Sequence, residues 1–138
     1  MYHLNMRKIL IVEDDTALYN LYATELQLKG YQVSNVSDGT LAVQAIKEQN
    51  PDLILLDLVL PGRNGLDILK ELRDDEDYAE TKVIVLTNFG NEENVSAALE
   101  LGATEYIMKY KIVPSELSEK ISTLFGDSGN DTGVRVTG

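Results

Sequence analysis

Short apolar runs alternate with stretches of helical periodicity along most of the chain. The runs are typical of strands, and they occupy positions 7–12, 31–36, 53–57, 82–87 and 104–109. After each run, apolar residues recur every three or four positions, which predicts helices at 16–29, 38–49, 66–73, 91–101 and 114–125. Strands that alternate with helices through short loops predict an α/β fold, a three-layer doubly wound sheet of five parallel strands.

The helical patterns also predict which side chains are buried. Leu41, Ala42, Ala45 and Ile46 share one face of the second predicted helix. Val95, Ala98 and Leu99 are expected to face inward from the fourth predicted helix.

The third run is the centre of the predicted sheet. Its apolar residues extend from Leu53 to Leu56 between Pro51 and the Pro61-Gly62 pair, and the run ends on a carboxylate, Asp57. A charge at the end of a buried strand is costly unless the strand has reached the surface or a cation lies beside it. In a doubly wound sheet ligands bind beyond the carboxyl ends of the strands, so the other strand ends indicate what surrounds Asp57.

Composition narrows the classes of function. The chain has 138 residues, no cysteine and a net charge of −11, with 12 basic and 23 acidic side chains. The absence of cysteine excludes disulfides and thiolate chemistry and suits a cytoplasmic protein. The acidic balance disfavours nucleic-acid binding by this chain alone, and no apolar run has the length to span a membrane.

Acidic, hydroxyl and basic side chains follow the predicted strands. The first strand is followed by Glu13 and Asp14, the third ends on Asp57, the fourth on Thr87 and the fifth on Lys109. If the first and third strands are neighbours, three carboxylates share one rim, and each pair at ~4 Å costs about 4 kcal/mol at an effective dielectric of ~20. Oxygen ligands without histidine or cysteine are typical of Mg²⁺.

Each of these residues also has an ordinary structural interpretation. Glu13-Asp14-Asp15 is a favourable acidic start for a helix. Asp57 alone suits a turn, and Lys109 alone suits a solvated strand end. The functional hypothesis therefore depends on the whole set of strand ends rather than on one residue.

The set resembles the receiver domain of bacterial two-component response regulators. The resemblance rests on Val12-Glu13-Asp14, on Asp57 followed by Pro61 and Gly65, and on Thr87 and Lys109, in that order. It extends from about Lys8 to Phe125 and implies a flavodoxin-like sheet with strand order 2-1-3-4-5. The length is similar to that of stand-alone receivers in chemotaxis.

The resemblance implies a role for each residue. Asp57 is implied as the acceptor of a phosphoryl group from a histidine kinase or phosphotransfer protein. Asp14, Asp57 and the carbonyl of Val59 are implied to hold Mg²⁺, with Glu13 reaching it through water. Lys109 and Thr87 are implied to bind the phosphoryl group, and Tyr106 to move with Thr87. Phosphorylation would then alter the face formed by the fourth helix, the fifth strand and the fifth helix.

Three positions depart from the family pattern, and one of them is Val59, which is apolar where an amide or acid can help attacking water elsewhere in the family. Tyr110 follows Lys109, where the family usually has a proline in a cis bond. A cis bond before a residue other than proline costs roughly 2.5–4 kcal/mol, so this turn is expected to be either trans and rearranged or cis and strained. Asn88 follows Thr87, where a small residue is usual.

Several alternatives remain open from the sequence. We expect a receiver domain at 1–126 and a flexible tail at 127–138, in a non-enzymatic regulator that is a monomer or a phosphorylation-dependent dimer. The chain could act on a protein target directly, or it could be part of a longer DNA-binding regulator with an output domain. A phosphatase of the haloacid-dehalogenase type is disfavoured, because that class needs a carboxylate where Val59 stands. A receiver that is never phosphorylated is disfavoured by the complete set of strand-end residues.

Overall fold

The computed structural model describes residues 6–88 and 92–126. Within them, a parallel five-stranded sheet has the order β2-β1-β3-β4-β5, which confirms the predicted doubly wound topology. The strands are β1 (Lys8–Val12), β2 (Gln32–Val36), β3 (Leu53–Asp57), β4 (Lys82–Thr87) and β5 (Glu105–Met108).

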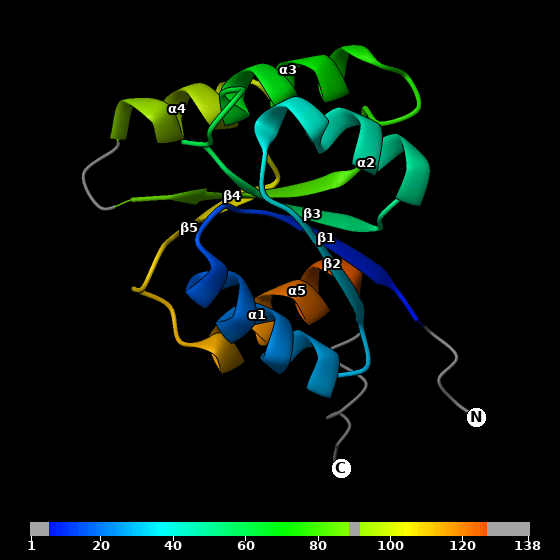
Figure 1. The fold of residues 1–138 in the computed structure, drawn as a ribbon, viewed down its shortest axis with the longest axis vertical. Coiled ribbons are helices and arrows are strands. Elements are labelled where there is room, and N and C mark those ends of the chain that lie inside the picture. Colours follow the sequence, from blue (N-terminus) through cyan, green and yellow to red (C-terminus); the bar gives the residue numbers. More distant parts are fainter. Residues whose placement is uncertain (1–5, 89–91, 127–138) are drawn as a thin grey trace.

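Helices cover both faces of the sheet and give three layers (Figure 1). On one face lie α1 (Thr16–Leu28) and α5 (Pro114–Phe125). On the other face lie α2 (Ala42–Gln49), α3 (Gly65–Asp74) and α4 (Glu92–Glu100). In the part of the chain that the structure describes, no helix combines the length and the apolar character that crossing a membrane requires.

The central strand β3 explains why the sequence pattern is so clear. Leu53 and Leu55 pack in the apolar cluster beneath α1 and α5, whereas Ile54 and Leu56 pack in the cluster beneath the other three helices. Because both faces of a parallel sheet are covered, the strand reads as a continuous apolar run rather than as an alternating one. The edge strand β2 is only half-buried, and its sequence alternates accordingly.

Two of the predicted inward positions are wrong. Leu41 is 52% exposed, because residues Gly39–Leu41 form a separate 3₁₀ turn (η1) whose start is capped by the Asp38 carboxylate. This tighter turn takes Leu41 out of register with the inward face of α2. Leu99 is 45% exposed, because the fully buried Ala98 occupies the inward face of α4 and its neighbour points about 100° away.

Close backbone contacts position the loop that follows β3. The Gly39 N–H donates to the Pro61 carbonyl at 2.9 Å, and a Cβ atom on Gly39 would overlap the carbonyl oxygen of Arg63. At the other end of the loop, the Gly65 N–H donates to the Leu58 carbonyl at 3.0 Å. The loop is therefore fixed both by the turn after β2 and by the start of α3.

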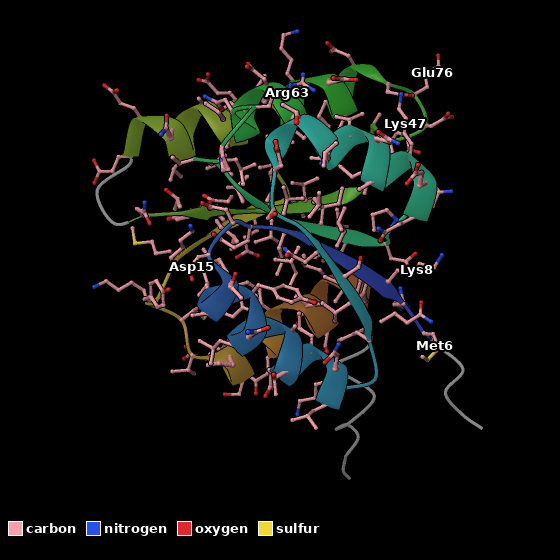
Figure 2. All side chains as sticks on the ribbon, in the orientation of Figure 1. Met6, Lys8, Asp15, Lys47, Arg63 and Glu76 are labelled. Atoms are coloured by element: carbon pink, nitrogen blue, oxygen red, sulfur yellow. The ribbon has the colours of Figure 1, made fainter. Side chains whose placement is uncertain are left out.

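The two ends of the sheet carry different charged residues. Figure 2 shows Lys8 at the amino end of β1 and Asp15 near its carboxyl end. The carboxyl end is the edge at which the strand-end residues meet. Two predicted segments, the start of the fourth helix at Asn91 and the tail at 127–138, lie outside the described residues.

Candidate functional site

The register of the sheet brings the predicted strand ends together. Val12 of β1 is aligned with Leu56 of β3, so Glu13 follows β1 beside Asp57 at the end of β3. On the other side Asp57 is aligned with Leu86 of β4, one residue before Thr87. Thr87 is in turn aligned with Met108 of β5, and Lys109 comes next in the chain.

Lys109 joins the two buried carboxylates of this edge. Its Nζ lies 2.8 Å from Asp57 Oδ2 and 3.0 Å from Glu13 Oε1, and its side chain is 10% exposed. Burial lowers the pKa of Lys109, but the hydrogen bonds and charges of Asp57 and Glu13 outweigh it and raise the pKa above its usual value. The lysine therefore remains charged between the two acids.

Three carboxylates cluster at this edge, and two of them pair with this single lysine. Glu13, Asp14 and Asp57 each offer one oxygen within 4.8 Å of the others; Glu13 and Asp57 are buried and Asp14 is exposed. Burial raises the pKa of Glu13 to about 7, and the charge of Asp57 raises it as well, against the opposing effects of the Asp15 N–H and of Lys109. One lysine does not compensate three carboxylates, so the site favours an additional cation.

The donor set fits Mg²⁺ rather than a softer metal. All three candidate side chains are carboxylates, which are hard oxygen ligands. The neighbouring Asp15 is already engaged, because its Oδ1 accepts from the Leu18 N–H as the helix cap and its Oδ2 accepts from the Tyr110 hydroxyl. Asp14 is thus the exposed acid of the β1–α1 loop that is left for a metal.

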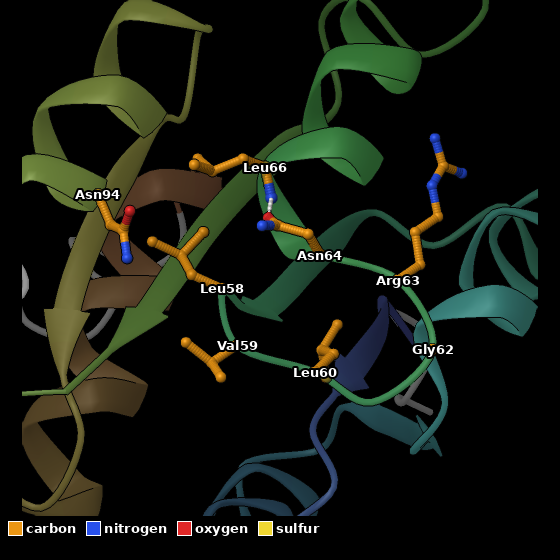
Figure 3. A pocket seen from close by; sticks show the side chains of 8 residues that line it. All are labelled: Leu58, Val59, Leu60, Gly62, Arg63, Asn64, Leu66 and Asn94. Atoms are coloured by element: carbon orange, nitrogen blue, oxygen red, sulfur yellow. Dashed lines mark hydrogen bonds between the residues drawn. The ribbon is translucent and has the colours of Figure 1, made fainter.

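The loop after Asp57 forms one wall of a pocket beside the site (Figure 3). Leu58, Val59 and Leu60 line it, with Asn94 of α4 opposite, and its volume is about 280 Å³. The Val59 N–H donates to Asp57 Oδ1 at 3.0 Å, and the Val59 side chain is 58% exposed. Each Asp57 oxygen is therefore held by one donor, Oδ1 by Val59 and Oδ2 by Lys109.

Thr87 ends β4 at this edge, whereas Tyr106 lies within β5, two residues before the partner of Thr87. Thr87 is buried, and its hydroxyl donates to the Asn88 carbonyl at 3.3 Å. Tyr106 on β5 is aligned with Val85 of β4, and its side chain is 41% exposed. The structure therefore places Thr87 at the site and leaves the Tyr106 ring, on the neighbouring strand, partly in solvent.

The turn after Lys109 resolves the expectation about a cis bond. Among the described residues every peptide bond is trans, and Tyr110 adopts a left-handed conformation with φ of 63°. Its hydroxyl donates to Asp15 Oδ2 at 2.6 Å and links two loops that are 95 positions apart. Sequence reasoning missed this role of Asp15, because no local pattern predicts a hydrogen bond over such a separation.

Comparison with known proteins identifies the family. Residues 9–122 match the response regulator receiver domain. The chain belongs to the response regulator receiver family. It is 38% identical over 115 residues to the DNA-binding response regulator MtrA of Mycolicibacterium paratuberculosis, an alignment that covers 83% of this chain and 49% of that protein.

Solved receiver structures share the fold. The BeF3-activated N-terminal receiver domain of Klebsiella pneumoniae RstA has a TM-score of 0.77 at 32% identity, with 85% of this chain and 97% of that chain covered. The phosphorylated cyanobacterial phytochrome response regulator RcpA has a TM-score of 0.73 at 30% identity, with 86% and 91% covered. The receiver chain thus spans nearly all of these structures but about half of MtrA.

Proposed function

We propose that this receiver is a phosphorelay switch whose acceptor is Asp57. The observation that carries the proposal is the buried Asp57 carboxylate, held at 2.8 Å by Lys109 at the carboxyl edge of a doubly wound sheet. A buried acid that is paired with a lysine and open to a cation is arranged for phosphoryl transfer, which depends mainly on positioning and electrostatics.

The proposed donor is a phosphohistidine on a histidine kinase or a phosphotransfer protein. An Asp57 oxygen attacks phosphorus while the P–N bond of the donor breaks, and the electron pair of that bond stays on the imidazole nitrogen, which takes up a proton. Lys109 then pairs with a phosphoryl oxygen, and the Thr87 hydroxyl turns from the Asn88 carbonyl toward the phosphoryl group. The chain needs no further substrate, so it acts as a regulator rather than an enzyme.

Mg²⁺ is the proposed cofactor. Asp14, Asp57 and the Val59 carbonyl would hold it, with Glu13 acting through water. When bound, the ion neutralises charge on the transferring group and aligns it with the acceptor. The protein contributes to metal binding by keeping Asp14 exposed and by fixing the Asp57 carboxylate through the Val59 N–H.

The output is proposed to pass through the α4-β5-α5 face. Tyr106 is 41% exposed on β5, so it can move inward when Thr87 is drawn toward a phosphoryl group. The binding partner of the α4-β5-α5 face is proposed to be a downstream protein, a second copy of the chain, or an output domain. The match covers about half of MtrA, which is a DNA-binding response regulator. The second candidate function is therefore that of a receiver within a longer DNA-binding regulator.

The domain bounds and the cellular compartment of the chain are also proposed. We assign residues 1–126 to the receiver and 127–138 to a tail, in a cytoplasmic protein. The net charge of −11 supports partners that are proteins rather than nucleic acid for this chain alone.

Amide NMR spectra would test the switch. On addition of Mg²⁺ and phosphoramidate, a small phosphohistidine analogue, we expect the largest shifts at Asp57 and Thr87 and a second group of shifts at Tyr106 and along α4 and α5. A matched sample with EDTA should show none of them. Shifts confined to the loops around Asp57, with Tyr106 unchanged, would mean that the chain accepts phosphoryl groups without switching this face.

A further inference from the structure

The turn that carries Lys109 has an unusual backbone. Tyr110 is one of two non-glycine residues with positive φ among those described; the other, Asn50, is the C-cap of α2, where this conformation is common. A tyrosine in the left-handed region is disfavoured and persists only where its surroundings hold it there. The turn therefore needs specific contacts to keep its shape.

Two of these contacts are backbone hydrogen bonds on either side of Tyr110. The Lys109 N–H donates to the Thr87 carbonyl at 2.8 Å, and the Lys111 N–H donates to the Met108 carbonyl at 3.1 Å. They fix the backbone on both sides of Tyr110, and the first of them joins Lys109 to the end of β4.

The third contact ties the tip to the acidic loop after β1. The Tyr110 hydroxyl donates to Asp15 Oδ2 at 2.6 Å, and this bond is the main cause that lowers the pKa of Asp15. The Asp15 N–H donates in turn to Glu13 Oε2 at 2.9 Å, and Glu13 pairs with Lys109 at 3.0 Å. Lys109, Glu13, Asp15 and Tyr110 thus form a closed ring of contacts, completed by the Lys109–Tyr110 peptide bond.

Tyr22 does not give the turn a second hydroxyl bond within the described part of the chain. Tyr22 of α1 is completely buried, and its hydroxyl has no hydrogen-bond partner in the described part of the chain. Burial raises the pKa of Tyr22, and the Tyr110 backbone opposes the rise. The hydroxyl bond to Asp15 is thus a side-chain hydrogen bond that anchors the tip from its exposed side.

We propose that Tyr110 is a positioning residue for phosphoryl acceptance, and that its hydroxyl bond to Asp15 holds Lys109 in place beside Asp57. The proposal rests on the proposed function of Asp57. Tyr110 is 64% exposed and touches neither Asp57 nor Lys109 Nζ through its hydroxyl, so it acts through Lys109 and the β1–α1 loop. Loss of the hydroxyl would leave the Mg²⁺ ligands in place but let the lysine move.

The test compares Tyr110→Phe with Tyr78→Phe. Both variants lose one tyrosine hydroxyl that donates to a side chain, but Tyr78 bonds to Asn50 at 3.2 Å, away from the strand ends. For Tyr110→Phe we expect labelling by subsaturating acetyl phosphate to slow about fivefold, the effect of one net hydrogen bond. The Kd of Mg²⁺ should stay within about twofold of the wild type, because Asp14, Asp57 and Val59 are unchanged. Tyr78→Phe should label like the wild type.

Hydrogen exchange of the Lys111 amide is the second measurement, and it needs neither metal nor donor. In Tyr110→Phe this amide is expected to exchange several-fold faster than in the wild type and in Tyr78→Phe. Labelling equal to that of Tyr78→Phe, unchanged Lys111 exchange, or a parallel loss of Mg²⁺ affinity would each overturn the proposal. If the wild type itself takes no label, the proposed function fails, and the exchange measurement still decides whether Tyr110 holds the turn.

Discussion

Replacing Lys109 with methionine is expected to destabilise the metal-free protein by about 3–5 kcal/mol at pH 7, the usual cost of breaking a buried ion pair by removing one partner. Methionine preserves the length and apolar stem of the side chain, so the loss is mainly electrostatic. Glu13 and Asp57, both 1% exposed, would then face each other without the cation that separates them.

The pH dependence of the Lys109→Met variant provides an internal check. Without the lysine, the pKa of Glu13 in the folded state, already about 7 in the native site, rises further above its unfolded value. A carboxyl with a raised folded pKa prefers to be protonated in the fold, so it lowers stability as pH rises through this range. The stability deficit relative to wild type should therefore shrink as pH falls from 7 toward 5.

Urea unfolding at both pH values would measure these effects. The matched control is Lys70→Met, which removes an exposed lysine paired with Asp74 at 3.1 Å; its cost should be about 0.5 kcal/mol or less. A Glu13→Gln substitution added to Lys109→Met should restore part of the lost stability. A Lys109→Met variant within about 1 kcal/mol of the wild type would show that the lysine does not balance these acids.

Replacing Gly65 with alanine is expected to destabilise the protein by about 1–3 kcal/mol, as overpacking of a close contact does. Gly65 begins α3, and in a helix alanine is ordinarily favoured over glycine by about 1 kcal/mol. Here a Cβ atom would overlap the carbonyl oxygen of Asp57 and lie 2.7 Å from Leu58 Cα, both of them backbone atoms. Gly65→Ala is therefore expected to lower the stability of the protein, whereas helix propensity alone would raise it.

The same contact links Gly65 to the acceptor. To admit a methyl group, either α3 or the Asp57–Leu58 backbone must shift, and phosphoryl transfer is sensitive to such displacements. Labelling of Gly65→Ala should therefore be slower than that of the wild type. Gly30→Ala is the control: its φ of 95° makes alanine costly by about 1 kcal/mol, but nothing lies within 4 Å and the site is distant. A Gly65→Ala variant more stable than the wild type would contradict the close approach.

The fold could be predicted from the sequence because the central strands of the sheet are buried on both faces. Leu53–Leu56 is continuously apolar, and the helices alternate with such runs at regular intervals. Finer features depend on tertiary contacts: Leu41 has the spacing of an inward residue, but a 3₁₀ turn capped by Asp38 exposes it. A turn type of this kind leaves no distinct periodic pattern.

The sequence was sufficient to predict which strand-end residues make up the candidate site. The parallel sheet requires Glu13, Asp57 and Lys109 to share one edge, and the structure joins them by distances of 2.8–3.0 Å. The contact of Tyr110 with Asp15 could not be predicted, because it depends on a left-handed backbone and on side chains 95 positions apart. Family resemblance pointed to the turn only by the absence of proline.

Intact-mass measurement of Asp57→Asn tests the central claim most directly. Wild type, Asp57→Asn and Asp52→Asn would each be incubated with acetyl phosphate and Mg²⁺; Asp52 is the exposed acid at the opposite end of β3, where it accepts from the Lys8 N–H at 2.8 Å. We expect the wild type and Asp52→Asn each to gain the mass of one phosphoryl group, and neither to gain it when EDTA is present throughout. Asp57→Asn is expected to gain no phosphoryl group under either condition. Equal labelling of Asp57→Asn and wild type would contradict the assignment of Asp57 as the acceptor.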